Sequence, residues 1–353
     1  MADRLHPQDV LKALAAVRDP TQQRDIVSLG LVRDIEVGDN RVSLKLLAAN
    51  PSSPVAARLA QEAKKAVQAL GPSEVRVELA GAPAVGASAQ ASLIPQVRHT
   101  VAVGSGKGGV GKSTVAANLA VALQRSGAKV GLLDTDVYGP SIPHLMGSVA
   151  GPVVVEGKIT PPVAYGVKIM SMAYFLPKDE AVIWRGPMLH KAIHQFLGDV
   201  EWGELDYLVI DMPPGTGDVQ LSLGQTISLT GAVIVSTPQD MALEVASKAI
   251  AMFRKLNVPI LGVIENMSYY ACPHCGKRED IFGHGGARAA AGAMHLPFLG
   301  EIPLDVNIRT ASDHGRPVAL QDSEPYAMAF REASQAVIQQ VEKARKDTEI
   351  SIE

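Results

Sequence analysis

The sequence is poor in cysteine and in aromatic residues, and it has no large excess of charge of either sign. Aromatic residues make up 4% of the 353 residues, which argues against a protein that stacks on nucleobases. A net charge of −3 is not the basic footprint of a nucleic-acid-binding protein. No apolar run approaches the ~20 residues of a membrane span, and the first residues lack a signal-peptide pattern. We therefore expect a protein that binds neither nucleic acid nor membrane.

A glycine-rich segment predicts a nucleotide site. Residues 104–114 contain the phosphate-binding pattern G-x-x-x-x-G-K-[ST]. Glycines let backbone N–H groups approach phosphates closely. The β-rich run 99–103 and the Ala/Leu/Val run 114–124 predict a strand before the loop and a helix after it, with the phosphates at the helix N-terminus. The residues expected to bind ATP here are Gly104, Ser105, Gly106, Lys107, Gly108, Gly109, Val110, Gly111, Lys112, Ser113 and Thr114.

Four residues have predicted roles at the phosphates. We expect Lys112 to reach the β- and γ-phosphates and the Ser113 hydroxyl to bind Mg²⁺. Two aspartates follow buried-strand runs, where open α/β sheets bind ligands. We expect Asp211 to hold Mg²⁺ and Asp136 to orient the attacking water. An aspartate that ends a strand is also a common helix cap or turn residue, so both assignments depend on the glycine loop.

Five segments share their pattern with one protein family. They are the loop with its extra lysine, Lys107, and residues 134–141, 184–188, 211–218 and 265–268. These segments resemble the Mrp/ApbC iron-sulfur cluster carriers, which are deviant-Walker P-loop ATPases related to nitrogenase iron protein, ParA and MinD. The resemblance extends from about residue 99 to residue 341. It implies a homodimer in which Lys107 crosses to the partner's nucleotide, as a third catalytic residue beside Lys112 and Asp136. It also implies that Asn266 contacts the adenine.

Both cysteines of the chain, Cys272 and Cys275, lie in one Cys-Pro-His-Cys segment. An iron-sulfur cluster or a closed zinc site generally has four ligands, whereas one chain offers two thiolates. A twofold dimer would bring two pairs together on its axis, which predicts a shared 4Fe-4S cluster, as the resemblance also implies. Three alternatives remain open. They are a zinc site, bridged across the dimer or closed within one chain by His284 and His295, a dithiol redox centre, and an inert surface pair.

The composition changes along the chain and predicts four parts. Residues 1–80 predict a small α+β domain of order α-β-β-α-β, and residues 81–97, rich in Pro, Gly, Ser and Ala, predict a flexible linker. Residues 98–345 form the expected ATPase domain, and residues 346–353 a tail. For the ATPase domain we expect the α/β fold of a P-loop NTPase, with a mainly parallel twisted sheet and helices on both faces. Strand runs near residues 99, 130, 207, 232, 260 and 298 alternate with helical stretches, which is typical of this fold.

The small first domain resembles the PaaD-like assembly domain that is fused to some of these carriers. Residues 19–20 and 25–32 carry this resemblance. Many such domains have a cysteine after the second strand, but here residues 50–54 read Asn-Pro-Ser-Ser-Pro. We therefore assign no cluster ligand to this domain and expect it to dock partners or to modulate the ATPase. A passive folding or solubility module is the alternative.

The sequence thus predicts an ATP-hydrolysing carrier, with ATP, Mg²⁺ and a 4Fe-4S cluster as bound groups. We expect it to hold the cluster at a homodimer interface and to transfer it to apo client proteins, with cluster assembly factors as further partners. Reduced thiols beside a nucleotide site favour the cytoplasm. The main competing interpretation is a positional ATPase of the ParA or MinD kind with a structural zinc at the cysteine pair. A nitrogenase-like electron donor is a second competitor.

Overall fold

The computed structural model describes residues 6–18, 25–27, 31–38, 40–48, 54–81, 93–137, 139–175, 186–215, 217, 220, 224, 226–240 and 243–350. The chain forms two compact units, Met1–Gln90 and Ala91–Glu353. The division falls within the linker predicted at 81–97, of which residues 82–92 lie outside the described part. The expectations for residues 19–20, 50–53 and 184–185 also concern residues outside it.

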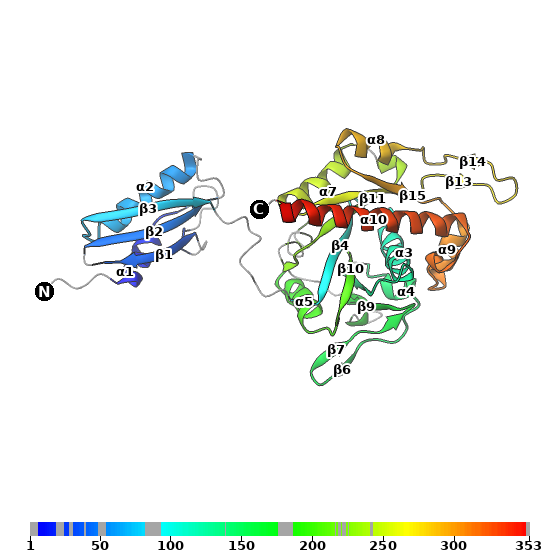
Figure 1. Cartoon of the computed structure of the whole chain (residues 1–353), viewed down its shortest axis with the longest axis horizontal. Helices are drawn as coiled ribbons and strands as arrows, with labels where there is room; N and C mark the ends of the chain where they lie inside the picture. The colour runs from blue at the N-terminus through cyan, green and yellow to red at the C-terminus, as the bar shows by residue number, and fades with distance from the viewer. Residues whose placement is uncertain are drawn as a thin grey trace. The chain divides into compact units, whose positions relative to one another are not determined.

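The first unit is a three-stranded sheet with two helices (Figure 1). Strand β2 lies in the middle, antiparallel to β1 and parallel to β3. Alternate residues of β2, namely Val42, Leu44 and Leu46, are buried in one core with the apolar sides of both helices. This alternation has the period of a strand with one covered face. In chain order the elements are α1 (Pro7–Leu14), β1 (Val32–Val37), β2 (Arg41–Ala48), α2 (Pro54–Gln68) and β3 (Glu74–Gly81).

The second unit is built on an eight-stranded sheet (Figure 1). The strand order is β15-β12-β11-β4-β10-β5-β9-β8, and every pairing is parallel except that of β8 with β9. This confirms the predicted α/β fold with a mainly parallel sheet. The strands are β4 (Val97–Ser105), β5 (Val130–Asp134), β8 (Val163–Ala164), β9 (Val167–Ser171), β10 (Leu205–Asp211), β11 (Gly231–Ser236), β12 (Ile260–Glu265) and β15 (Phe298–Glu301).

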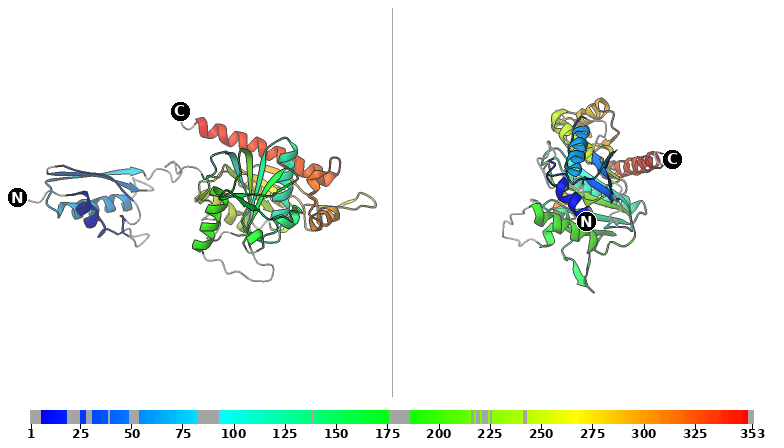
Figure 2. Two further views of the ribbon diagram at one scale, coloured as in Figure 1. Left: turned by 90° about the horizontal axis from the view of Figure 1, so that it is seen from below. Right: turned by 90° about the vertical axis from the view of Figure 1, so that its left-hand side faces the viewer.

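Helices cover both faces of this sheet, as Figure 2 shows. Successive residues of β10 point to opposite sides, so Val209 packs in one core while Leu208 and Ile210 pack in the other. Because both sides are covered, the central strands are continuous apolar runs. One core contains α3 (Lys112–Arg125) and α10 (Pro325–Ile350), and the other contains α5 (Gly186–Gly198), α7 (Leu243–Lys255) and α8 (Gly286–Ala293).

The carboxyl ends of the parallel strands meet at one edge of the sheet. Asp211 at the end of β10 pairs with Asp134 of β5 and with Val103 of β4. Ser236 of β11 pairs with Glu265 at the end of β12. The loops that follow these strands therefore gather at the same edge, which is where open α/β sheets bind ligands.

Smaller elements complete the second unit. A short hairpin, β13 (Tyr270–Ala271) with β14 (Arg278–Glu279), projects from the unit in Figures 1 and 2.

Helix α10 continues to Ile350, through residues 346–350 of the predicted tail. Within the described residues, no helix combines the length and apolar character that crossing a membrane requires. The remaining elements are α4 (Ile142–Leu145), β6 (Val153–Val155), β7 (Lys158–Thr160), η1 (Met172–Phe175), η2 (Pro238–Asp240), α9 (Val306–Asp313) and η3 (Val318–Leu320).

Candidate nucleotide and metal sites

The predicted phosphate loop connects β4 to α3. Helix α3 begins at Lys112, directly after the last glycine of the loop. The free amides at its N-terminus and the helix dipole therefore favour an anion here. Gly109 and Gly111 have φ angles of 82° and 77°, in the left-handed region that side-chain-bearing residues rarely adopt. The loop thus has the local geometry that the sequence pattern predicts.

Asn266 lies against this loop. It follows β12, and its Nδ2 donates a hydrogen bond to the Val110 carbonyl at 2.8 Å. A Cβ on Gly111 would lie 2.3 Å from the same nitrogen, so glycine is required there by contact as well as by φ. The expected contact of Asn266 with adenine stays a prediction. What the structure adds is a direct link between the end of β12 and the loop.

Lys112, Ser113 and Asp211 form a buried polar group beneath the loop. The Lys112 Nζ lies 2.5 Å from Asp211 Oδ1, and the Ser113 hydroxyl donates to Asp211 Oδ2 at 2.6 Å. The side chains of Lys112 and Asp211 are 6% and 0% exposed. Three of the predicted site residues therefore meet, although Asp211 is 98 residues from Ser113 in sequence. In the nucleotide-free protein the Asp211 carboxylate therefore balances the positive charge of Lys112.

The donor atoms of this group suit Mg²⁺. Mg²⁺ prefers oxygen ligands and keeps several waters, so it needs only one or two groups from the protein. The Ser113 hydroxyl oxygen and a carboxylate oxygen of Asp211 already lie within 2.6 Å of each other at the helix N-terminus. A cation bound there would replace the hydrogen bond between them. The residues present therefore fit the ion.

A second buried carboxylate, Asp134, lies beside Asp211. Burial and the negative charge of Asp211 raise the pKa of Asp134 to about 7. Hydrogen bonds from the Ser171 hydroxyl at 2.9 Å and from the Ile142 amide at 3.2 Å oppose this increase. Burial also raises the pKa of Asp211, while Lys112 favours its charged form. Of the two carboxyls, Asp134 is therefore the one that holds a proton near neutral pH.

Asp136 and Lys107, the other two predicted catalytic side chains near this group, differ in exposure. Asp136 is 8% exposed, and its Oδ1 accepts a hydrogen bond from the Gly139 amide at 3.2 Å. This contact stabilises the turn, and the Asp136 charge also acts on the pKa of Asp211. The Lys107 side chain is exposed. An exposed side chain is able to reach a second chain, as its expected role requires.

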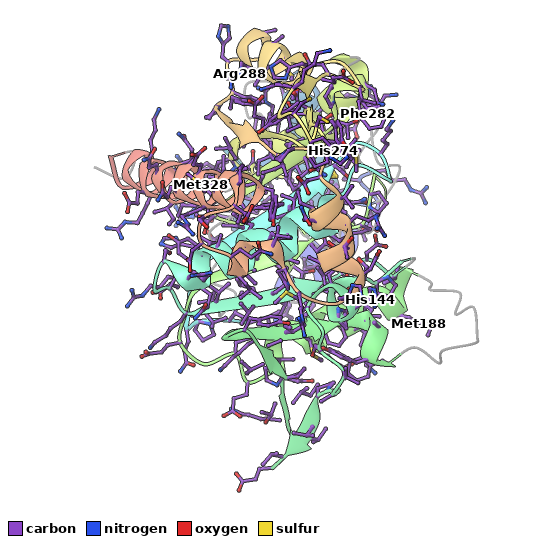
Figure 3. The ribbon with its side chains drawn as sticks, turned by 90° about the vertical axis from the view of Figure 1, so that its right-hand side faces the viewer. His144, Met188, His274, Phe282, Arg288 and Met328 are labelled. Carbon is purple, nitrogen blue, oxygen red and sulfur yellow. The ribbon has the colours of Figure 1, made fainter. Side chains whose placement is uncertain are left out.

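The cysteine pair occupies the turn of the β13–β14 hairpin. The Cys272 amide donates to the Lys277 carbonyl at 3.0 Å, and the Gly276 amide donates to the Cys272 carbonyl at 2.8 Å. Hydrogen bonds from the backbone amides of His274 and Cys275 to the Cys272 sulfur lower the pKa of this thiol, and the bond from His274 has the larger effect. Cys275 is exposed, and His274 is labelled in Figure 3. The turn thus favours a thiolate, the form that binds metals.

The hairpin offers few other ligands. Among the described residues, the single group of three or more His, Cys, Asp and Glu side chains close enough to share an ion is Glu265, His284 and Glu301, and it includes neither cysteine. The two ring nitrogens of His284 lie 2.7 and 3.0 Å from Arg278 Nη2. His295 is exposed in the turn after α8. These positions do not favour a zinc site closed within one chain by the two histidines.

Apart from His284, a candidate zinc ligand, the residues in and around this group have no role predicted from the sequence. Arg278 and Glu279 form a strand that has no strong sequence signal, and Glu265 was part of a family-like segment without a function of its own. The one available signal was chemical. A carboxylate ending an apolar strand, Ile260–Glu265, needs a partner when it is buried, and Glu265 is 0% exposed.

Two family models match the chain. Residues 96–341 match a family described as NUBPL iron-transfer P-loop NTPase, and residues 7–79 match one described as iron-sulfur cluster assembly protein. The matches fall in the second and first units respectively.

Curated relatives are similar over most of the chain. An iron-sulfur cluster carrier protein of Deinococcus radiodurans is 49% identical over 336 residues, 94% of this chain and 95% of the relative. One of Synechocystis is 42% identical over 323 residues, 89% of this chain and 92% of the relative. An Arabidopsis thaliana protein named iron-sulfur protein required for NADH dehydrogenase, mitochondrial, is 48% identical over 260 residues, 73% of this chain and 83% of the relative.

Solved structures agree with this relationship. A nucleotide-binding protein from Archaeoglobus fulgidus in complex with ADP is 43% identical, with a TM-score of 0.59, covering 65% of this chain and 90% of that one. The cell division ATPase MinD of Pyrococcus furiosus is 24% identical, with a TM-score of 0.52 and coverage of 68% and 98%, and shows the shared fold. The chain therefore belongs to the iron-transfer P-loop NTPase family and is an ATPase of the P-loop class.

Proposed function

We propose that this protein is a carrier that holds a 4Fe-4S cluster between two copies of the chain, hydrolyses ATP and passes the cluster to apo client proteins. The observation that carries the proposal is the cysteine turn. Backbone amides point at the Cys272 sulfur, and a second thiol stands beside it. A turn of this kind stabilises metal-bound thiolates, and its thiols lie on an exposed hairpin rather than in a core.

The number of ligands favours a shared site. A 4Fe-4S cluster takes four thiolates, and one chain has two cysteines. Within the described residues, no other group of ligands includes Cys272 or Cys275. A twofold axis through the hairpins of two copies would supply the missing pair. The cluster is cargo in this proposal, so the chemistry at the sulfurs is ligand exchange.

The nucleotide site has a conventional assignment of roles. Lys112 leaves Asp211 to contact the β- and γ-phosphates, and Ser113 and Asp211 hold Mg²⁺, which neutralises phosphate charge. Asp136 orients the attacking water. Lys107 reaches from the partner chain toward the transferred phosphate. These roles are consistent with the burial of Lys112 and the exposure of Lys107.

The names of the relatives support carriage over a positional role. Relatives at 49% and 42% identity are named iron-sulfur cluster carrier proteins, whereas the likeness to Pyrococcus furiosus MinD is 24%. We further propose a cytoplasmic location, where thiols stay reduced. The first unit, which matches an assembly-protein family, is the proposed docking site for clients or assembly factors.

Anaerobic reconstitution tests the proposal. The full chain is incubated with iron and sulfide, separated by size, and assayed for iron, sulfide and zinc, with Cys272→Ala/Cys275→Ala as the control. We expect about four irons and four sulfides per dimer, and neither in the double variant. Incubation with an apo iron-sulfur enzyme should then restore that enzyme's activity. Zinc without sulfide would contradict the proposal and favour a positional ATPase with a structural zinc.

A further inference from the structure

A buried carboxylate fixes the end of β12. Glu265 accepts hydrogen bonds from the Gly285 amide at 3.0 Å and the Ala287 amide at 2.6 Å, both at the start of α8. The Ser268 hydroxyl donates to the same carboxylate at 2.6 Å. A carboxylate at a helix N-terminus is stabilised by the free amides and by the helix dipole. The Glu265 carboxylate thus joins both ends of the segment 265–268 to each other and to the start of α8.

This segment faces the nucleotide loop on one side and the cysteine hairpin on the other. On the loop side, Asn266 donates to the Val110 carbonyl at 2.8 Å, and there is no space for a side chain on Gly111. On the hairpin side, the Ser268 hydroxyl lies 3.1 Å from His284 Nδ1 and 3.2 Å from Glu301 Oε2. Any displacement of Asn266 by a nucleotide therefore acts on a short segment that ends at the hairpin.

On β14, Arg278 joins the hairpin to this segment. Its guanidinium lies 3.8 Å from the centre of the Tyr269 ring, and its Nη1 lies 3.5 Å from Glu301 Oε1. Its Nη2 contacts the His284 ring, with 2.7 Å to Nδ1. In the strand register Arg278 pairs with Ala271, the residue before Cys272. A single side chain therefore links the cysteine turn to the end of β12, to β15 and to the start of α8.

The same residues do not form a metal site. Glu265, His284 and Glu301 offer ligand atoms within 4.8 Å of one another. Each already has a partner, however, because amides and Ser268 occupy Glu265, while Arg278 contacts both His284 and Glu301. Arg278 already supplies the positive charge that a metal ion would bring. The cluster of Glu265, Ser268, Arg278, His284 and Glu301, the β12-end cluster, is therefore a set of hydrogen bonds and ion pairs that connects β12, β14, β15 and the start of α8.

We propose that Arg278 is the positioning residue through which nucleotide binding changes the hold of the cysteine hairpin on its iron-sulfur cargo. This inference rests on the proposed carrier function and adds to it the residues that couple its two sites. A nucleotide that bears on Asn266 moves the segment 265–268, and the β12-end cluster transmits this movement to β14. By linkage, cargo in the hairpin changes nucleotide affinity by the same factor.

A series of three variants tests this. Arg278→Gln removes the guanidinium, and Glu301→Gln removes its carboxylate partner. Lys277→Gln is the matched control, since Lys277 is the neighbouring exposed cation of the same turn and its ion pair is with Glu279 at 3.2 Å. Each full-length protein is reconstituted with iron and sulfide. The rate at which an iron chelator removes the cluster is then measured with and without a non-hydrolysable ATP analogue.

We expect the analogue to change the wild-type rate by at least ~5-fold, the lower end of common coupling effects. In Arg278→Gln and Glu301→Gln the ratio should lie within ~2-fold of one, and their combination should add nothing further. Lys277→Gln should behave as wild type. Nucleotide affinity of the cluster-free proteins and iron content per chain should be unchanged. A wild-type ratio of one, or a wild-type ratio retained in Arg278→Gln, would overturn the inference.

Amide hydrogen exchange of residues 270–279 in cluster-free protein gives a second readout, needed if Arg278→Gln does not retain the cluster. Nucleotide should change exchange in these residues in wild type and in Lys277→Gln, and not in Arg278→Gln. A nucleotide-dependent change that persists in Arg278→Gln would contradict the inference. Absence of bound iron and sulfide from the wild type would instead contradict the carrier function itself, so the two failures are distinguishable.

Discussion

Asp134 and Asp211 lie directly opposite each other at the ends of the neighbouring parallel strands β5 and β10, and both are fully buried. Two carboxylates so placed repel each other when both are charged. Lys112 contacts Asp211 at 2.5 Å, so the proton is held by Asp134, whose pKa is raised to about 7. The nucleotide-free site therefore holds a buried proton on Asp134 and a buried, ion-paired Lys112.

This pairing predicts a pH dependence of stability. The pKa of Asp134 rises from 3.8 to about 7 on folding, so the folded state binds this proton more tightly than the unfolded state. The resulting stabilisation is complete below pH 4 and is lost as pH rises to about 7. We expect the nucleotide-free melting temperature to fall across this window, and to fall less in Asp134→Asn. Thermal unfolding of both proteins from pH 5 to 8 measures the difference, and equal slopes would refute the assignment.

Replacing Asp136 should separate binding from hydrolysis. Asp136→Ala removes the carboxylate proposed to orient the attacking water but none of the groups proposed to contact phosphate. We expect the Kd for ATP to change little and the hydrolysis rate to fall by roughly 10²–10⁴-fold, as for loss of a positioned acid or base. Asp136 also accepts a hydrogen bond from the Gly139 amide. Asp136→Asn keeps an acceptor oxygen for this bond and is therefore the matched control for folding. Hydrolysis at the wild-type rate in both variants would exclude the role.

Lys107 should act on the nucleotide of the other chain. Lys107→Gln is expected to bind ATP normally and to hydrolyse it about 10³-fold more slowly, by analogy with the loss of an arginine finger. Lys112→Gln should be inactive because its own nucleotide site lacks the lysine proposed to contact the β- and γ-phosphates. Mixing these two inactive variants should restore hydrolysis, because in mixed dimers the Lys107→Gln chain keeps Lys112 at its own nucleotide and the Lys112→Gln chain donates Lys107 to that nucleotide. The readout is phosphate release at varying mixing ratios, and a mixture as inactive as its components would mean that Lys107 does not act across the interface.

Cys272 should react as an unusually acidic thiol. The His274 and Cys275 amides that face its sulfur lower its pKa, and the thiolate is the reactive form. In metal-free folded protein, alkylation of Cys272 by iodoacetamide should therefore reach its half-maximal rate at a lower pH than in urea. Mass spectrometry of the modified peptide follows the reaction, and Cys275→Ser removes the neighbouring thiol as a check. The same pH midpoint in folded and unfolded protein would contradict this.

Much of the fold was predictable because its signals are local. The strand runs near residues 99, 130, 207, 232, 260 and 298 all became strands of the sheet, since continuous apolar runs can be buried on both faces only between helices. The phosphate loop was equally readable, because its glycines have positive φ angles that other residues avoid. Element order in the first unit followed from period-2 and helical spacing.

The contacts between distant segments were not predictable in the same way. Asn266 meets Val110 across 156 residues, and Thr135 meets the Asp211 carbonyl across 76. Such pairs depend on strand order, which a single sequence does not encode in any local pattern. Arg278 lies in a hairpin strand of two residues, too short to produce a periodicity. Its partners lie after β12, on β15 and just before α8, and only the folded structure brings these elements together.

In the proposed carrier the cysteine turn gives each chain half of a binding site, so loading with cluster would follow mass action. A cluster held by two chains assembles with second-order dependence on carrier concentration, so dilution alone favours release. Doubling the amount of carrier in a cell would then raise the loaded fraction more than a single-chain site would. On this proposal, expression level would control how much cluster is in transit, independently of nucleotide supply.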